Sequence, residues 1–317
     1  MTALARRIPR SAIGYVAVVA AIVSFALSTP IVKWTGVTGV VIAFWRMWLS
    51  VATWWITVTV MRVRSHHGGE PFTGPDARTW KLVAPAGLCF GLNISLLFTA
   101  VTRTSIAHLE FIGSLTPLLV VPAGAILFGE RPNFSALRFG VISIVGVAIV
   151  LFFGPASGVA TLEGDLIMMV TLISWTSYLL LTKRARAAGV NTINFMACMM
   201  PTGLITAVPI AMVLAGRDLF DMTARGWFAA GVLAILTGMI AHGCIAFAQQ
   251  HLPIATITIM QTSQPGLAVL FAFVILGEEV RWLQIVGMAL VIIGIILFTR
   301  AAQQPEKSTT PEPARAA

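Results

Sequence analysis

A repeat within the chain places the strongest constraint on its fold. Three residues of one stretch recur 148 positions later in another: Pro117, Gly129 and Glu130 correspond to Pro265, Gly277 and Glu278. Both stretches are otherwise apolar and nearly uncharged. Composition alone would scatter prolines and glycines without aligning this pattern, so we infer a duplicated membrane unit. Internal duplication of a helical bundle is typical of membrane transporters.

The composition leads independently to a membrane protein. Hydrophobic residues make up 57% of the chain and charged residues 10%, against about 45–50% and about 25% in soluble domains. A helix needs about 20 apolar residues to cross the hydrocarbon. On this criterion we predict ten spans, at 11–32, 39–61, 82–102, 105–128, 134–153, 163–182, 192–215, 227–248, 254–277 and 282–299.

The predicted fold is an all-α integral membrane bundle of ten transmembrane helices, arranged as two inverted five-helix repeats. Because each repeat has an odd number of spans, the second enters the membrane from the opposite side. We expect repeats at 11–153 and 163–299, a cytoplasmic N-terminus at 1–10 and a disordered cytoplasmic tail at 300–317.

The distribution of Lys and Arg predicts the orientation. Most of the 21 basic residues fall in alternate loops, at 1–10, 62–81, 131–138, 183–186 and 300–317. Cytoplasmic loops carry such an excess of basic residues. Both termini are therefore expected on the cytoplasmic side of a bacterial inner membrane. The net charge of +9 then reflects loops close to anionic lipid and indicates no nucleic-acid partner. The expected partners are a small-molecule substrate and the bilayer, with a homodimer left open.

Polar residues within spans 4 and 9 indicate where a site would form. Both spans carry polar residues at helical spacing, on symmetry-related faces: Glu110, Gly113, Ser114 and Pro117 in one, and Thr258, Gln261, Thr262 and Pro265 in the other. Intramembrane polar groups face protein or water. We therefore expect a central cavity lined by spans 1, 3, 4, 6, 8 and 9, with Gln261 and Gln264 as hydrogen-bonding groups.

Glu110 is a candidate for proton coupling or for binding a substrate ammonium. Within the membrane its carboxyl would be desolvated, which suits a proton carrier. The alternative is a position at the helix entrance, where Glu110 pairs with Arg103 or with the helix dipole. His108, two residues earlier, is interpreted as a packing histidine, with proton coupling as the alternative.

Arg46, in span 2, is the candidate for binding a substrate carboxylate or for countering Glu110, with a snorkelling interfacial cation as the alternative. Asn93 and His242 occupy comparable places in spans 3 and 8, as cavity residues or as hydrogen-bonding glue between helices. Trp175 and Tyr178, three residues apart in span 6, could stack on an apolar part of a ligand or pack against lipid.

Prolines and glycines mark the ends and bends of the repeated helices. Pro117 and Pro265 each remove a backbone hydrogen bond in mid-helix, which permits a kink and makes both hinge candidates. Gly129 and Gly277 are expected to end their helices. Glu130 is expected to be a water-exposed structural residue that pairs with Arg131 or Arg138.

No motif for catalysis, metal binding or cofactor binding is recognised. The three cysteines lie inside apolar spans and are odd in number, which supports neither a disulfide framework nor a metal site. The loops contain no phosphate-binding glycine motif, no HExxH and no Ser/His/Asp arrangement. A membrane enzyme that modifies lipid would need a cluster of catalytic residues at one interface, and this stays a remote alternative.

The phrase Ser-Leu-Thr-Pro-Leu-Leu at 114–119, which leads to Leu-Phe-Gly-Glu-Arg at 127–131, resembles the drug/metabolite transporter superfamily. Its echo from Gln264 to Glu278 narrows the resemblance to the EamA-domain branch, with two repeats over 13–152 and 164–299. Lys33 and Arg46 also fall where that family usually carries basic residues. The second repeat departs there, because Asn194 stands opposite Arg46.

This resemblance implies export of small metabolites driven by the proton gradient or by exchange. Residues 107–113 are similar to a stretch of bacterial threonine and homoserine exporters, which favours amino acids as substrates. The superfamily also contains carriers of other solutes, so an uncoupled facilitator or an exchanger of sugars, nucleosides or drugs is the alternative. The resemblance implies neither an enzyme nor a cofactor.

Overall fold

The structure is a computed structural model that describes residues 10–101, 103, 112–130, 134–153, 161–277 and 281–303. The predicted residues Glu110 and His108 lie outside these ranges, as do most of the two termini. All regular secondary structure within the described ranges is helical. The helices run in the order α1 (Arg10–Thr35), α2 (Gly39–His66), α3 (Ala77–Val101), α5 (Thr116–Phe128), α6 (Phe134–Phe152), α7 (Leu162–Ala187), α8 (Thr192–Ala215), η1 (Gly216–Phe220), α9 (Ala224–Leu233), η2 (Ala234–Ala241), α10 (His242–Ala248), α11 (Ile254–Gln261), α12 (Gln264–Leu276) and α13 (Trp282–Gln303).

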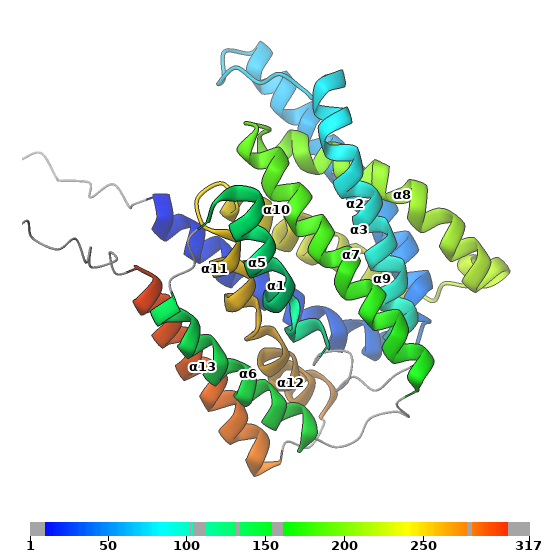
Figure 1. Cartoon of the computed structure of the whole chain (residues 1–317). Helices are drawn as coiled ribbons and strands as arrows, with labels where there is room; N and C mark the ends of the chain where they lie inside the picture. Colours follow the sequence, from blue (N-terminus) through cyan, green and yellow to red (C-terminus); the bar gives the residue numbers. More distant parts are fainter. Residues whose placement is uncertain are drawn as a thin grey trace, which may run out of the picture.

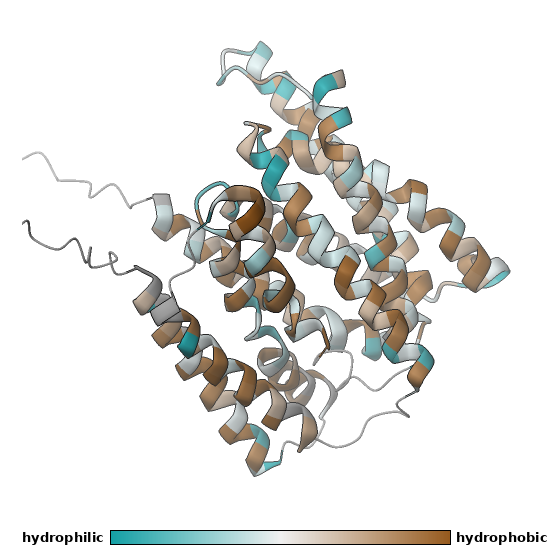
Figure 2. Cartoon of the chain, viewed as in Figure 1, coloured by the Kyte–Doolittle hydropathy of each residue, from teal (hydrophilic) through white to brown (hydrophobic). Residues whose placement is uncertain are grey.

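These helices form a membrane bundle (Figure 1). Seven are long and apolar enough to cross a bilayer, and three shorter apolar helices at 112–128, 137–149 and 282–298 accompany them. Each predicted span coincides with one of these segments. Figure 2 shows apolar residues along the helices and a hydrophilic α2–α3 connection at one end of the bundle. The chain is therefore a multi-pass membrane protein.

Local sequence sets where several helices begin. Thr161, Asn191 and Thr223 are N-cap residues whose side-chain oxygens accept a hydrogen bond from the backbone N–H three residues later. These bonds satisfy donors that the first turn leaves unpaired. Asp76 does the same at α3, where its Oδ1 accepts from the Thr79 N–H at 2.8 Å. Hydrogen bonds from Thr79 lower the pKa of the Asp76 carboxyl.

The repeated glycines end their helices as predicted. Gly129 follows α5 with φ of 64°, and Gly277 follows α12 with φ of 67°. In each case the glycine N–H donates to the carbonyl four residues earlier, at 3.1 Å. The left-handed conformation favours glycine because it has no Cβ. α5 and α12 thus begin and end at positions that match through the 148-residue offset.

Pro117 and Pro265 do not lie within continuous helices. The helix is interrupted just before each proline, and the proline lies in the first turn of α5 or α12. A proline is tolerated there because the N–H of that turn has no helical partner. The described part of each span is therefore interrupted by a turn, after which the helix restarts one residue before the proline, at Thr116 or Gln264.

α6 and α13 form the most extensive helix–helix contact among the described residues, and they run antiparallel in Figure 1. A Cβ at Gly146 would lie 2.7 Å from the Gly287 carbonyl oxygen, and a Cβ at Gly294 would lie 3.0 Å from the Phe139 oxygen. Gly294 and Gly287 are the 148-residue counterparts of Gly146 and Phe139. α6 and α13 therefore make equivalent contacts with each other. Ser143 Oγ donates to the Val291 oxygen, its own counterpart, at 3.3 Å.

Gly146→Ala is expected to destabilise the protein, because the added Cβ would meet backbone atoms of Gly287 and Val291 that have no freedom to rotate away. Overpacking of this kind costs about 1–3 kcal/mol. Thermal unfolding of the purified protein in detergent should show a lower midpoint. Gly231→Ala in α9 is the control, since nothing lies within 4 Å of its Cβ position. Equal midpoints for the two variants would contradict the close-packed interface.

Candidate functional site

A cavity of about 620 Å³ lies between the helices. This volume is within the range of sites that hold a small molecule. Its lining comes from α1, α2, α3, the 113–117 segment, α7, η2, α10, α11 and α12, and includes Phe25, Ser28, Lys33, Arg46, Asn93, Phe98, Ser114, Pro117, Trp175, Thr237, His242, Thr258, Gln261, Gln264 and Pro265. The cavity thus gathers polar side chains from helices that lie far apart in the sequence.

The cavity occupies one half of the bundle and reaches the α1–α2 loop. Its lining residues come from the second half of α1, the second half of α3 and the first half of α7. Gly36, Val37 and Thr38, the loop after α1, also line it. The earlier half of α1 and the residues of α7 after Trp175 contribute no lining residue. The cavity therefore extends toward the side of the α1–α2 loop.

Arg46 brings a buried positive charge to the cavity. Arg46 is 3% exposed, and its Nη1 donates to the Thr237 hydroxyl. The guanidinium also lies over the Phe98 ring, 5.9 Å from the centroid. Its Nε has no hydrogen-bond partner in the described part of the chain. Among the described lining residues there is no Asp or Glu, so these residues give the cavity a positive character.

Thr237, which no sequence pattern identified, lies in the π-helical segment η2. The wider turn exposes backbone that α2 contacts: Trp54 Nε1 donates to the Gly238 oxygen at 2.9 Å. π-helical segments are frequent at functional sites. The available sequence signal was the Thr-Gly pair in mid-span, which gives no direction for the hydroxyl. The irregular helix thus places Thr237 against Arg46.

His242 and its neighbours form an aromatic cluster beside the cavity. Its ring centroid lies 5.0 Å from Phe25, 4.6 Å from Phe90 and 6.0 Å from Trp175. Tyr178 Oη lies 3.3 Å from His242 Nδ1. Trp175 and His242 line the cavity, whereas Tyr178 is fully buried behind them and contributes no lining atom. The contact available to a solute is therefore with Trp175 and His242 rather than with Tyr178.

The other predicted site residues also meet here. Asn93 lines the cavity while its Nδ2 donates to the Thr171 oxygen at 3.0 Å, so it also joins α3 to α7. Ser114, Gln261 and Gln264 line the cavity. Gln261 Oε1 is buried and has no hydrogen-bond partner among the described residues. This oxygen and Arg46 Nε both have almost no accessible surface, so Arg46 and Gln261 line the cavity through their other atoms.

The expectation for Glu130 was wrong. Glu130 is neither water-exposed nor paired with Arg138: its side chain is 13% exposed and its Oε1 lies 3.2 Å from Lys183 Nζ. Arg138 instead lies over the Phe139 ring, 4.8 Å from the centroid. Arg103 pairs with Glu163 at the start of α7. Sequence spacing favoured local partners, whereas the fold supplies distant ones.

A multi-pass helical bundle that encloses a cavity of this size is compatible with a membrane transporter. The sequence profile of the EamA-like transporter family matches residues 12–152 and 162–300. The chain therefore belongs to the EamA-like transporter family, which confirms the resemblance found in the sequence. A transporter is thus established over the remote alternative of a lipid-modifying enzyme.

Relatives and solved structures agree with this family. An "Uncharacterized transporter" of Clostridium kluyveri is 24% identical over 66% of this chain and 68% of that protein. "Protein PecM" of Dickeya dadantii is 23% identical over 70% and 74%. The aligned regions span 64% to 74% of the curated relatives that match. A solved structure described as "Crystal structure of protein" has a TM-score of 0.71 at 19% identity and covers 92% of this chain and 97% of its own, a likeness of fold.

Thr237→Val is expected to lower stability, because it leaves Arg46 Nη1 without its hydroxyl partner in a buried site. An unsatisfied buried donor costs about 1–3 kcal/mol. Thermal unfolding in detergent measures the effect. Thr57→Val is the matched control, since the Thr57 hydroxyl donates to the carbonyl oxygen of its own helix, four residues earlier, at 2.9 Å. A midpoint for Thr237→Val no lower than that of Thr57→Val would show that the Arg46–Thr237 bond contributes nothing.

Proposed function

We propose that the protein is a secondary transporter that exports small metabolites, amino acids or related compounds, by alternating access in a bacterial inner membrane. The observation that carries this proposal is the cavity, whose described lining includes the buried side chain of Arg46 and no Asp or Glu. A buried cation is costly unless hydrogen bonds and a counter-charge offset it. The substrate carboxylate is assigned to Arg46.

The rest of the cavity suits an amino acid. Gln261 and Gln264 provide hydrogen-bonding groups for the substrate amine, while Trp175 and His242 offer an aromatic surface to a side chain. Asn93 and Ser114 add polar contacts. Residues 107–113, which resemble threonine and homoserine exporters, point to the same solute class. The positive charge of the described lining disfavours an organic cation.

Alternating access is supported by the symmetry of the helix contacts. Between α6 and α13, Gly146 meets Gly287 while their counterparts Gly294 and Phe139 meet in the same way. A contact that is the same on both partners requires a twofold relation. Because α6 and α13 are antiparallel, the axis would lie in the membrane plane. The two family-matched segments, 12–152 and 162–300, are then the inverted repeats that rock against each other.

Two further parts of the proposal follow from the sequence. Both termini are placed in the cytoplasm on the distribution of Lys and Arg, and in Figure 1 the start of α1 and the end of α13 lie on the same side. Glu110 is proposed as the proton or ammonium group, with His108 as a second coupling candidate, on the basis of intramembrane position. Pro117 and Pro265, next to breaks in their spans, are proposed hinge points.

An amino-acid panel tests the substrate assignment directly. Proteoliposomes that hold the purified protein should accumulate one of the labelled amino acids when a pH gradient is imposed. Arg46→Gln is expected to lower kcat/KM for that amino acid by about 10- to 100-fold, because a charge-assisted hydrogen bond to the carboxylate is lost. The amide of the same amino acid lacks the carboxylate and should be carried equally by wild type and variant.

Arg46→Lys is the matched control, since it keeps the positive charge and should retain more activity than Arg46→Gln. If Arg46→Gln slows the acid and the amide equally, the variant has a general defect and the carboxylate assignment fails. Equilibration of the solute without accumulation would favour the alternative function, an uncoupled facilitator or exchanger. Absence of flux for every amino acid would direct the assay to sugars, nucleosides and drugs.

Glu110→Gln tests proton coupling. A glutamine side chain does not carry a proton at this position, so the variant is expected to lose pH-driven accumulation while it still exchanges labelled for unlabelled solute at equal pH. His108→Gln is the comparison, and it should keep pH-driven accumulation if His108 is a packing residue. Full accumulation by Glu110→Gln under a pH gradient would remove Glu110 from the coupling mechanism.

A further inference from the structure

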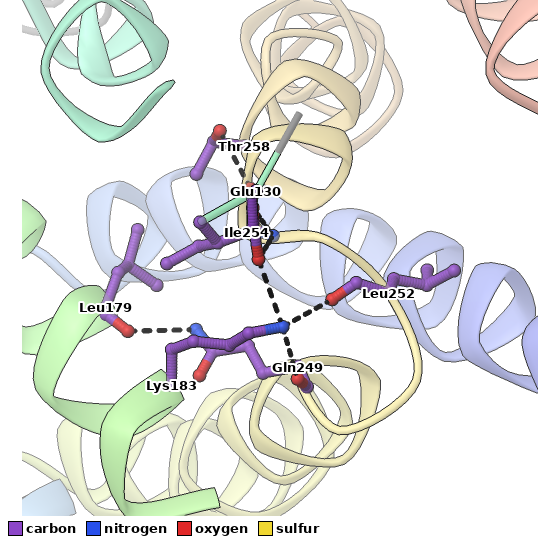
Figure 3. A network of polar contacts seen from close by, with 7 residues as sticks. All are labelled: Glu130, Leu179, Lys183, Gln249, Leu252, Ile254 and Thr258. Carbon is purple, nitrogen blue, oxygen red and sulfur yellow. Dashed lines mark hydrogen bonds and ion pairs between the residues drawn. The ribbon is translucent and has the colours of Figure 1, made fainter. Parts of the chain in front are cut away.

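Figure 3 shows a partly buried ion pair, Glu130–Lys183, with backbone partners. Lys183 Nζ, near the end of α7, lies 3.2 Å from Glu130 Oε1 and donates to the carbonyl oxygens of Gln249 and Leu252, both at 2.9 Å. These contacts use all three ammonium donors of Lys183. Glu130 follows the cap of α5, and its two carboxylate oxygens accept from the Ile254 N–H at 3.1 and 3.0 Å.

This network lies beyond the end of the cavity that is farther from the α1–α2 loop. On α7 the last lining residue is Trp175, and on α11 the first is Thr258. Lys183 is eight residues past Trp175, or about 12 Å along the helix, and Ile254 is one turn before Thr258, about 6 Å away. The ion pair and its backbone partners at Gln249, Leu252 and Ile254 do not line the cavity. The network therefore stands between the cavity and the end of the bundle opposite the α1–α2 loop.

The network also joins the two matched halves of the chain. Glu130 belongs to the segment 12–152, whereas Lys183 and Ile254 belong to the segment 162–300. Gly124 supports the same junction, because a Cβ there would lie 2.9 Å from Ile254 Cγ2 and 3.4 Å from Glu130 Oε2. By contrast, Arg186 Nη2 donates to Gln250 Oε1 at 2.7 Å wholly within the second half. Rocking of one half against the other would break the Glu130–Lys183 pair and leave the Arg186–Gln250 pair intact.

We propose that the Glu130–Lys183 pair is a gate that holds this end of the cavity closed while the α1–α2 side is open. The proposal rests on the alternating-access function above and assigns its gating residues. Lys183 and Glu130 are 15% and 13% exposed as side chains, so the closed gate excludes most water. When the halves separate, water replaces each lost hydrogen bond, so both charges become hydrated rather than stranded.

The gate is connected to the cavity through α11. The Glu130 carboxylate caps the first N–H of this helix, where a negative charge is favourable. Thr258 and Gln261, one and two turns along, line the cavity. Loss of the cap frees the start of α11 from α5. The same helix thus carries one side of the gate and two of the residues that face a solute.

Sided cysteine labelling tests the gate without requiring a known substrate. The reporter is Thr258→Cys, made in full-length protein whose Cys89, Cys198 and Cys244 are replaced by alanine. A membrane-impermeant maleimide is applied to vesicles of the two opposite orientations. Glu130→Gln and Lys183→Gln are expected to raise labelling from the Lys183 side by about tenfold, a population shift of about 1.4 kcal/mol. The charge exchange Glu130→Lys with Lys183→Glu should return labelling toward the parent rate.

Gln250→Ala is the matched control, because it removes a contact of α7 at the same end of the bundle but inside one half. It should leave labelling from the Lys183 side unchanged. Unchanged labelling in both neutralised variants, with a monodisperse folded protein, would overturn the gate. If neither variant folds, Gly124→Val decides: its side chain would press Ile254 away from Glu130, and labelling from that side must rise.

The transport assay separates this proposal from the one on which it rests. Solute flux combined with unchanged labelling would reject the gate and leave the transporter function intact. Increased labelling in protein that carries none of the tested amino acids would support the gate and reject the substrate assignment.

Discussion

The main constraint on this structure is that its polar groups must form hydrogen bonds where no bulk water is present. A helix that crosses a bilayer pairs its own backbone groups, but each break in the helix frees some of them. The breaks occur where protein surrounds the chain: before α5, between α11 and α12, and through the π-helical η2. All three adjoin the cavity. The irregular backbone and the site therefore arise together, because a space enclosed by protein is where irregularity is tolerated.

Arg46 shows how this constraint shapes the site. The guanidinium is held by one threonine hydroxyl and an aromatic face rather than by a described acid. This arrangement fixes its position but leaves the charge uncompensated by those partners. A carboxylate partner would have made a more stable resting protein and a poorer anion site. The contacts with Thr237 and Phe98 thus hold Arg46 in place for the carboxylate that we propose as its ligand.

The sequence predicted the class of fold, the helical spans and the glycine caps, because these depend on composition, length and local backbone preference. It also placed Arg46, Asn93, His242 and Gln261 in spans that now enclose one cavity. It did not predict the π-helical turn at Thr237, the position of Tyr178 behind His242 or the Lys183 partner of Glu130. Each of these depends on packing between distant helices, for which local spacing contains no signal. The restart of the helix at each proline likewise depends on neighbours that accommodate the turn.

The two ends of α11 differ in a way that local propensity does not explain. At its start the helix is fixed by a charge from α5, whereas at its end it passes through a tight turn into α12 beside the cavity. A helix of eight residues has little intrinsic stability, so its position follows its contacts. Those contacts come from α5 at one end and from the cavity wall at the other. In the gate that we propose, this helix, about 12 Å long, links the Glu130–Lys183 pair to the residues that line the cavity.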